Sequence, residues 1–340
     1  MNQTEWSNLP FGYQKTNINI RSYYREGEWG KLEFSDSEYI SVHMAATGLH
    51  YGQQAFEGLK AYMGNDGKVR LFRWEENAQR MQDSANGIMM AVPPMELFKE
   101  AVFNAVRLNK EFIPPYGTGA TLYVRPLLFG SGARVGVKPA DEYMFLVFVS
   151  PVGPYFKEGF NPVSIMVARD YDRAAPKGTG CYKVGGNYAA SLTAGEKAHK
   201  EGFASALFLD AREKKYIDEA GPANFFAIKG DNYITPLSES ILPSITNKSL
   251  MVLAEDMGMK VERRKIALEE LSEFDEVGAC GTAAVISPIR RIVDLEMGTE
   301  WNYCLDGKAG EKSSQLYHRL IDIQNGDAPD KFGWTTVVEM

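Results

Sequence analysis

The chain has 340 residues, 44% apolar and 24% charged, a composition typical of a globular protein with a large core and room for two domains. The formal net charge is −7, and basic residues do not cluster, which argues against nucleic acids and membranes as partners. The first residues, MNQTEWSNLPFGYQ, lack a basic segment followed by an apolar one. We therefore expect no signal peptide and a cytoplasmic location. Three cysteines without Cys-x-x-Cys spacing and four scattered histidines predict no disulfide framework and no metal site.

Helical periodicity is clearest in four segments, namely 72–88, 95–112, 246–259 and 313–326. In the second segment Phe98, Ala101, Ala105 and Leu108 share one apolar stripe, as expected of an amphipathic helix. The third has apolar residues at i, i+3, i+4 and i+7, and we expect Thr246 to be its N-cap. Glycines close the last two segments.

Runs of β-branched and aromatic residues lie between the helical segments and predict strands at 121–130, 143–152, 163–171, 205–213, 224–229 and 232–236. The run at 143–152, YMFLVFVSPV, is too short to cross a bilayer and predicts a buried strand. Several strands follow one another through short polar turns such as KGDN at 229–232, which favours the α+β class.

The stretch PVGPYFKEGFNP, residues 151–162, is the best candidate for a domain boundary because prolines and glycines punctuate structure. We therefore expect a small N-terminal domain over 1–152, an interdomain loop over 153–162 and a larger domain over 163–340.

One lysine, Lys183, stands among glycines in GTGCYKVGGNY, residues 178–188. A nucleotide phosphate-binding loop would need a serine or threonine directly after the lysine, and Val184 stands there. The glycines of FGSGARVG, residues 129–136, miss the dinucleotide-binding spacing by one position. Both nucleotide-binding alternatives are therefore weak.

Schiff-base chemistry is the other use for such a lysine, because a deprotonated lysine amine is a nucleophile. Pyridoxal phosphate, the widespread partner of such lysines, also needs an anion site, an acid at its ring nitrogen and a donor to its phenolic oxygen. The chain offers Glu219 before a Gly-Pro turn, a helix start at Ile245–Thr246, and Thr282 in a loop of small residues. Each of these alone is typical of an ordinary loop or cap, and only their combination with Lys183 favours the cofactor.

Six longer motifs resemble those of the branched-chain amino acid aminotransferases, and they occur here in the same order: HYGQQAFEGLKAY, LYVRPLLFG, CYKVGGNYAASL, DEAGPANFF, ILPSIT and GTAAVISPI. The resemblance covers nearly the whole chain. It implies the two-domain fold of fold type IV pyridoxal phosphate enzymes, with a small N-terminal α/β domain and a larger domain with a barrel-like core. It also implies reversible amino transfer between leucine, isoleucine or valine and 2-oxoglutarate in a homodimer.

The resemblance implies a role for each matching residue. Lys183 matches the Schiff-base lysine, Tyr188 the tyrosine at the phenolic oxygen and Glu219 the partner of the ring nitrogen. The phosphate-binding positions match Arg73, Ile245, Thr246 and Thr282. The substrate-binding positions, including those contributed by a neighbouring subunit, match Phe11, Tyr51, Phe56, Tyr123, Arg125, Val135, Val137 and Ala283. Within that set, Arg125 and Tyr123 match the pair that accepts the side-chain carboxylate of glutamate.

Pro222 departs from animal relatives, which carry a threonine there whose hydroxyl helps to bind the α-carboxylate; proline supplies neither a hydroxyl nor an N–H. Two alternatives share the fold and cofactor, a D-amino acid aminotransferase and an aminodeoxychorismate lyase. A third is a binding protein that keeps the fold without catalysis. Chain length and the YVRP and HYGQQAFEG motifs favour the branched-chain enzyme.

Overall fold

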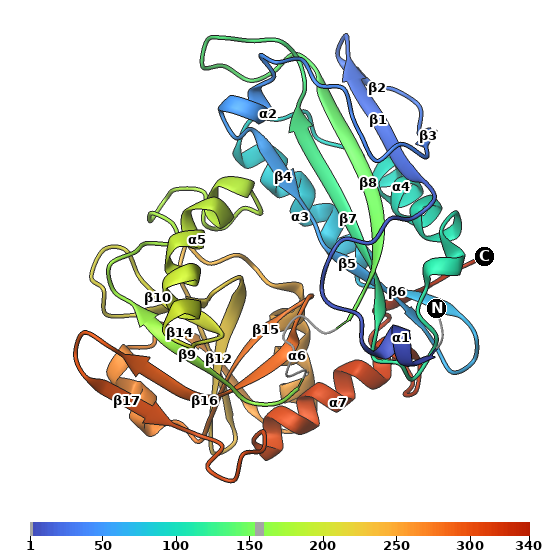
Figure 1. Ribbon diagram of the computed structural model, residues 1–340. Helices are drawn as coiled ribbons and strands as arrows, with labels where there is room; N and C mark the ends of the chain where they lie inside the picture. The colour runs from blue at the N-terminus through green and yellow to red at the C-terminus, as the bar shows by residue number, and fades with distance from the viewer. Residues whose placement is uncertain (1–2, 154–159) are drawn as a thin grey trace. The chain divides into compact units, whose positions relative to one another are not determined.

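A computed structural model describes residues 3–153 and 160–340 (Figure 1). Contacts within the chain divide it into two units, and the first comprises Met1–Pro154, Tyr182–Gly185 and Asp322–Met340. The second comprises Tyr155–Cys181 and Gly186–Ile321. The domain limits expected from the sequence stay a prediction, and 154–159 of the expected interdomain loop lie outside the described residues.

The first unit is built on an antiparallel sheet with the strand order β18-β6-β5-β7-β8-β1-β2, while β3 pairs with β1 and β4 with β7. Its central strands β7 and β8 pair over ten residues, from Thr121 opposite Val152 to Gly130 opposite Tyr143. The strands are β1 (Asn19–Arg25), β2 (Glu28–Trp29), β3 (Glu33–Ser35), β4 (Gln54–Phe56), β5 (Leu59–Met63), β6 (Val69–Phe72), β7 (Thr121–Gly130), β8 (Tyr143–Val152) and β18 (Thr335–Val338).

Two long helices, α3 (Trp74–Gly87) and α4 (Met95–Arg107), pack beside this sheet (Figure 1). Phe98 of α4 stacks on Phe145 of β8 with ring centroids 5.9 Å apart, within one apolar core cluster. Leu108, which the sequence placed in the buried stripe, is the residue that follows α4 and is 42% exposed. The short helices are α1 (Gln3–Ser7), α2 (Thr47–His50) and the 3-10 turn η1 (Lys110–Phe112).

The second unit contains a closed ring of strands in the order β11-β10-β9-β16-β15-β12, which the pairing of β12 with β11 completes. Strands β13 and β14 extend the sheet beyond β12, and β17 pairs with β16. The predicted α+β class with a barrel-like core is thus confirmed. The strands are β9 (Val163–Ala168), β10 (Ser205–Leu209), β11 (Ile217–Ala220), β12 (Ala223–Lys229), β13 (Asn232–Pro236), β14 (Lys260–Arg264), β15 (Glu276–Gly281), β16 (Val285–Asp294) and β17 (Thr299–Asn302).

The remaining helices are α5 (Gly185–Lys200), α6 (Ile245–Asp256), α7 (Glu311–Asn325) and the 3-10 turn η2 (Leu268–Glu273). The first residue of α5 and the end of α7 from Asp322 belong to the first unit, and the rest belongs to the second. The expected N-cap of α6 was wrong by two residues. Ser244 caps the helix, because its hydroxyl accepts a hydrogen bond from the Asn247 N–H at 3.2 Å, while Thr246 lies inside the first turn. Within the described residues, no helix is long and apolar enough to cross a membrane.

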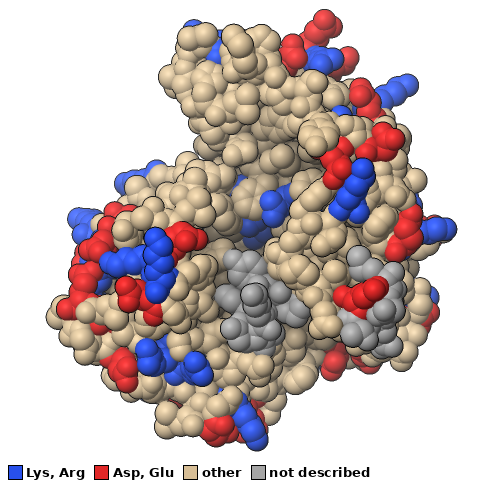
Figure 2. Space-filling model, in the orientation of Figure 1, with Lys and Arg blue, Asp and Glu red and all other residues tan. Residues whose placement is uncertain are grey.

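Acidic and basic side chains are interspersed on the face shown in Figure 2. Exposed ion pairs of the chain include Lys197 with Asp170 at 2.9 Å and Arg319 with Asp256 at 2.6 Å. Such pairs contribute little to stability. The mixed surface agrees with the sequence, in which basic residues do not cluster.

Candidate active site

The backbone of Lys183 is held by two separate elements of the first unit. Its N–H donates to Ser84 Oγ of α3 at 2.9 Å, and its carbonyl accepts from the Phe56 N–H of β4 at 3.0 Å. The next residue, Val184, forms an antiparallel bridge with Ala55. These contacts hold the backbone of Lys183 in place, although the residue lies outside regular strands and helices.

An aromatic ring and a guanidinium lie close to the Lys183 side chain. Lys183 Nζ lies 4.7 Å from the centroid of the Phe56 ring, and Arg125 Cζ lies 4.7 Å from the same centroid. Arg125 donates to the Tyr123 hydroxyl at 3.0 Å, and Phe11 packs edge-on against Tyr123 at 5.3 Å between centroids. The structure thus brings together five residues that the sequence assigned to the reactive amine and the substrate wall.

The segment between β4 and β5 is held in place by a buried ion pair. Glu57, which is fully buried, accepts from Arg80 Nε at 2.7 Å and from Asn77 Nδ2 at 2.7 Å, and both donors lie on α3. Its neighbour Gly58 leaves room for the Tyr123 hydroxyl, because a Cβ there would lie 2.1 Å from that oxygen. Positions next to Phe56 are therefore tightly restrained.

Arg73 stands immediately before α3 with a φ of +48°, in the left-handed region. Its N–H donates to the Trp334 carbonyl at 2.6 Å, and its guanidinium lies 5.0 Å from the Trp334 ring centroid. Its Nη2 lies 3.2 Å from Glu76 Oε1. Non-glycine residues with this backbone conformation are concentrated at functional sites, which agrees with the phosphate-binding role that the resemblance assigns to Arg73.

The residues assigned to a neighbouring subunit's pocket lie at the surface. Val135 is 80% exposed and Val137 is 83% exposed. The Tyr51 hydroxyl donates to the Val135 carbonyl, so the three residues belong to one surface region of the first unit.

The carboxylate of Glu219 is buried in β11 of the second unit, where it is 3% exposed. Its Oε1 accepts from the Leu242 N–H at 2.7 Å and lies 3.4 Å from Asn224 Nδ2. Its Oε2 lies 3.5 Å from Arg173 Nε. Burying a carboxylate costs free energy unless it is paired and hydrogen-bonded. These contacts therefore explain how Glu219 can be buried in β11.

The remaining cofactor-binding candidates of the second unit lie at element ends. Tyr188 lies in the first turn of α5, and Ile245 and Thr246 are the first two residues of α6. The first backbone N–H groups of a helix have no partner within the helix and favour an anion. Thr282 and Ala283 lie in the turn between β15 and β16.

Three residues around these candidates had no signal in the sequence. Ser84 contacts the Lys183 backbone, while Arg173 and Asn224 contact Glu219. The fold brings Ser84 to Lys183 and Arg173 to Glu219 from distant parts of the chain, whereas Asn224 lies in the DEAGPANFF motif and faces Glu219 across the β11–β12 hairpin. Arg173 stands ten positions before Lys183 in the loop DRAAPKGTG, which reads as an ordinary turn-rich segment. The buried thiol of Cys280 is not a further candidate, because burial raises its pKa and makes it unreactive.

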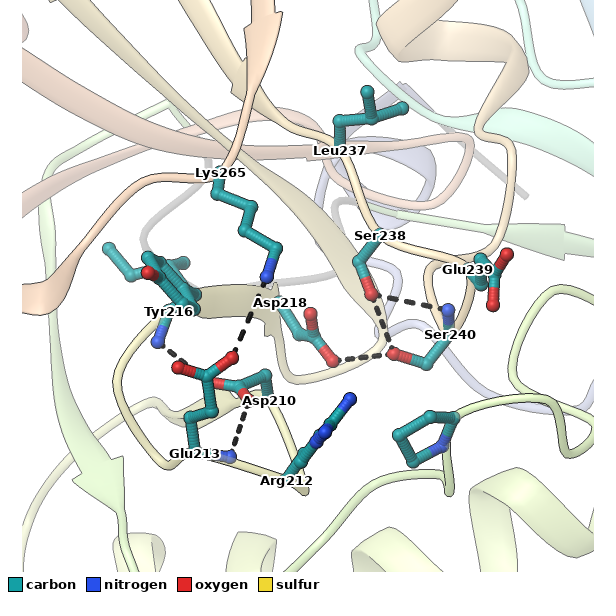
Figure 3. A pocket seen from close by; sticks show the side chains of 12 residues that line it. Asp210, Arg212, Glu213, Tyr216, Asp218, Leu237, Ser238, Glu239, Ser240 and Lys265 are labelled. Atoms are coloured by element: carbon teal, nitrogen blue, oxygen red, sulfur yellow. Dashed lines mark hydrogen bonds and ion pairs between the residues drawn. The ribbon is translucent and has the colours of Figure 1, made fainter.

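A pocket of about 500 Å³ also lies in the second unit, and Figure 3 shows the side chains that line it. None of the predicted site residues lines this pocket, but Asp218, next to Glu219 in β11, does. Burial raises the pKa of the Asp218 carboxyl, and a hydrogen bond from Ser240 counteracts this. Ser240 Oγ donates to Asp218 Oδ2 at 2.7 Å.

Comparison with known proteins agrees with this arrangement. The sequence pattern of the family Amino-transferase class IV matches residues 54–292. A branched-chain-amino-acid aminotransferase from Haemophilus influenzae is 45% identical over 346 residues, covering 100% of this chain and 100% of the relative.

Solved structures give the same result. The Escherichia coli branched-chain amino acid aminotransferase superimposes with a TM-score of 0.80 at 29% identity, covering 95% of this chain and 100% of that one. The branched-chain amino acid aminotransferase from Thermoproteus uzoniensis, solved with norvaline, has a TM-score of 0.76 at 26% identity, covering 94% and 100%. A further branched-chain amino acid aminotransferase, complexed with N-(5'-phosphopyridoxyl)-L-glutamate, has a TM-score of 0.77 at 26% identity, covering 96% and 99%.

The family match and the fold define a class IV aminotransferase. Within that class, the chain belongs to the branched-chain-amino-acid aminotransferase family. The family, the fold class and the aminotransferase activity expected from the sequence are thereby confirmed.

Proposed function

We propose that this chain transfers amino groups reversibly between leucine, isoleucine or valine and 2-oxoglutarate, with Lys183 as the reactive amine. The observation that carries the proposal is the placement of Lys183 Nζ against Phe56, beside Arg125 and Tyr123. The family membership of the chain and the phosphopyridoxyl glutamate bound by one of its structural relatives support the choice of substrates.

Pyridoxal phosphate is the proposed cofactor, and the residues at the candidate positions have the chemistry to hold it. Glu219 supplies a buried, hydrogen-bonded carboxylate for the ring nitrogen, and the start of α6 supplies backbone N–H donors for the phosphate. The full proposed set is Lys183, Arg73, Tyr188, Glu219, Ile245, Thr246 and Thr282. When bound, the cofactor supplies an electron sink for the charge that develops at the substrate α-carbon.

The residues of the chain move the protons. Lys183 Nζ would take the proton from the substrate α-carbon and deliver it to the carbon of the cofactor that receives the amino group, a role that requires a neutral amine. Aromatic contact with Phe56 removes water from one side of that amine. The Glu219 carboxylate holds a proton on the ring nitrogen of the cofactor, and the backbone N–H groups of Thr282 and Ala283 bind the α-carboxylate.

The substrate wall explains how one pocket accepts two kinds of side chain. Phe11, Phe56 and Tyr123 offer apolar surface, and burying a branched aliphatic side chain there contributes about 1.5–3 kcal/mol. A glutamate carboxylate against the same wall needs a cation. The Arg125 guanidinium, which also donates to the Tyr123 hydroxyl, provides it.

A homodimer completes the proposal. Tyr51, Val135 and Val137 would contribute to the pocket of the partner subunit, and their exposure in the single chain supports this. Exposed apolar side chains that are grouped on one part of a surface are typical of an interaction site.

Lys183→Ala tests the proposed function. We expect loss of the visible absorbance of lysine-bound pyridoxal phosphate, loss of its borohydride-reducible adduct and loss of turnover. Lys200→Ala, at the exposed end of α5, is the matched control and should retain all three. Retained turnover in Lys183→Ala would overturn the assignment. Half-reactions with leucine, isoleucine, valine, glutamate and D-alanine test the substrates, and a preference for D-alanine would contradict the proposal.

A further inference from the structure

A buried arginine faces the carboxylate that we assign to the cofactor's ring nitrogen. Arg173 is 8% exposed, and its Nε lies 3.5 Å from Glu219 Oε2. The other carboxylate oxygen, Oε1, accepts from the Leu242 N–H at 2.7 Å. Glu219 therefore has a hydrogen-bond donor at one oxygen and a cation at the other.

Two carbonyl groups anchor the guanidinium of Arg173. Its Nη2 donates to the Gly180 carbonyl at 3.1 Å and also to the Ser240 carbonyl. Gly180 and Ser240 approach each other so closely that a Cβ at position 180 would lie 2.2 Å from the Ser240 carbonyl oxygen. The two anchors use Nη2, and within the described residues Nε has no hydrogen-bond partner. The edge of the guanidinium that carries Nε therefore faces Glu219.

A second carboxylate lies near this arginine and must be distinguished from Glu219. Asp218 precedes Glu219 in β11 and lines the pocket of Figure 3, where Ser240 Oγ donates to it at 2.7 Å. Ser240 thus contacts Asp218 through its hydroxyl and Arg173 through its carbonyl. Replacing Arg173 could therefore affect cofactor binding in two ways, by its contact with Glu219 or by its proximity to Asp218.

We propose that Arg173 is a positioning residue that compensates the charge of Glu219 and orients its carboxylate toward the ring nitrogen of the cofactor. The inference rests on the proposed function. A carboxylate presents about four lone-pair directions. Leu242 occupies one direction at Oε1 and Arg173 restrains Oε2, so the ring nitrogen meets a carboxylate of defined orientation. A compensated charge is also less costly to bury before the cofactor binds.

A double-mutant cycle tests the proposal, with the dissociation constant of pyridoxal phosphate, followed by visible absorbance, as the readout. We expect Arg173→Met to weaken binding by about tenfold, within the range found for contacting residues. Arg173→Lys keeps the charge and should recover most of that loss. In a Glu219→Gln background Arg173→Met should change binding by less than about twofold, because the charge to be compensated is gone.

Asp218→Asn is the matched control, because it neutralises the adjacent carboxylate. In that background Arg173→Met should still cause its about tenfold loss. An unchanged dissociation constant in Arg173→Met would overturn the proposal. An equal loss of affinity in the wild-type and Glu219→Gln backgrounds would also overturn it. So would a loss of affinity that disappears only in the Asp218→Asn background. If Arg173→Met does not fold, the same cycle is run with Arg173→Gln, which also removes the charge, and an additive outcome has the same meaning. A wild-type chain that binds no pyridoxal phosphate contradicts the proposed function rather than the role of Arg173.

Discussion

Replacing Arg125 by alanine is expected to separate the two substrate classes. The guanidinium donates to Tyr123 at 3.0 Å and lies 4.7 Å from the Phe56 centroid, so its charge is presented at an otherwise aromatic wall. Removing one partner of a desolvated charge pair costs about 2–5 kcal/mol. Arg125 is only half-buried, so we take the lower end, about 2–3 kcal/mol, or a factor of roughly 30–150 in kcat/KM for glutamate.

Leucine should be much less affected by the same change. It makes no charge pair with Arg125, and it loses only the packing that the arginine stem provides at the wall. We expect its kcat/KM to fall by less than about threefold. Single-turnover half-reactions with each amino acid give both values for the cofactor-loaded enzyme. Arg125→Lys keeps a charge but lacks the planar guanidinium. Its kcat/KM for glutamate should lie between those of the wild type and Arg125→Ala.

Arg25→Ala serves as the matched control, because Arg25 lies at the end of β1 in the same sheet and its side chain is 62% exposed. Arg25→Ala should leave kcat/KM unchanged for both glutamate and leucine. Equal losses for glutamate and leucine in Arg125→Ala would refute the reasoning, since they would show a structural role for the arginine. Unchanged glutamate turnover would refute it as well.

Three further predictions concern the surroundings of the site. Gly58→Ala would place a Cβ 2.1 Å from the Tyr123 hydroxyl, so the ring must shift and its hydrogen bond with Arg125 is disturbed. We expect glutamate kcat/KM to fall about tenfold more than that of leucine. Burial lowers the pKa of Lys60 to about 8 from its usual 10.5. Between these pH values the unfolded chain binds more protons than the folded one, so the free energy of unfolding should rise by about 3 kcal/mol from pH about 8 to pH about 10.5. Urea unfolding of Lys60→Met should lack this rise. Arg80→Met leaves the buried carboxylate of Glu57 without its cation and should lower the free energy of unfolding by about 3–5 kcal/mol.

Each of these predictions has an outcome that contradicts it. For Gly58→Ala it is an equal loss of kcat/KM for glutamate and leucine. The control is Gly195→Ala, because an added Cβ there meets nothing within 4 Å. For Lys60→Met it is a pH dependence of stability parallel to that of the wild type. For Arg80→Met it is a loss of less than about 1 kcal/mol, the size of an exposed ion pair.

Strands and helices with strong local patterns were predicted well from the sequence. The limits of β7, β8 and β13 match the expected runs, and α7 ends before Gly326 as expected. Helix α5 was missed, because it opens with two glycines and buries only Asn187, Ala194 and Ala198 among its side chains. Such a helix depends on tertiary packing rather than on an apolar stripe.

The sequence by itself determined the family and the chemical candidates, because six motifs and the residue types at their positions are local properties of the chain. It identified Lys183, Glu219 and Arg125 without any distance between side chains. Only the tertiary structure placed Ser84 beneath Lys183 and Arg173 beside Glu219, since these pairs are separated by 99 and 46 positions in the sequence. Electrostatic compensation of a buried charge depends on such spatial neighbours, and no local pattern in the sequence records them.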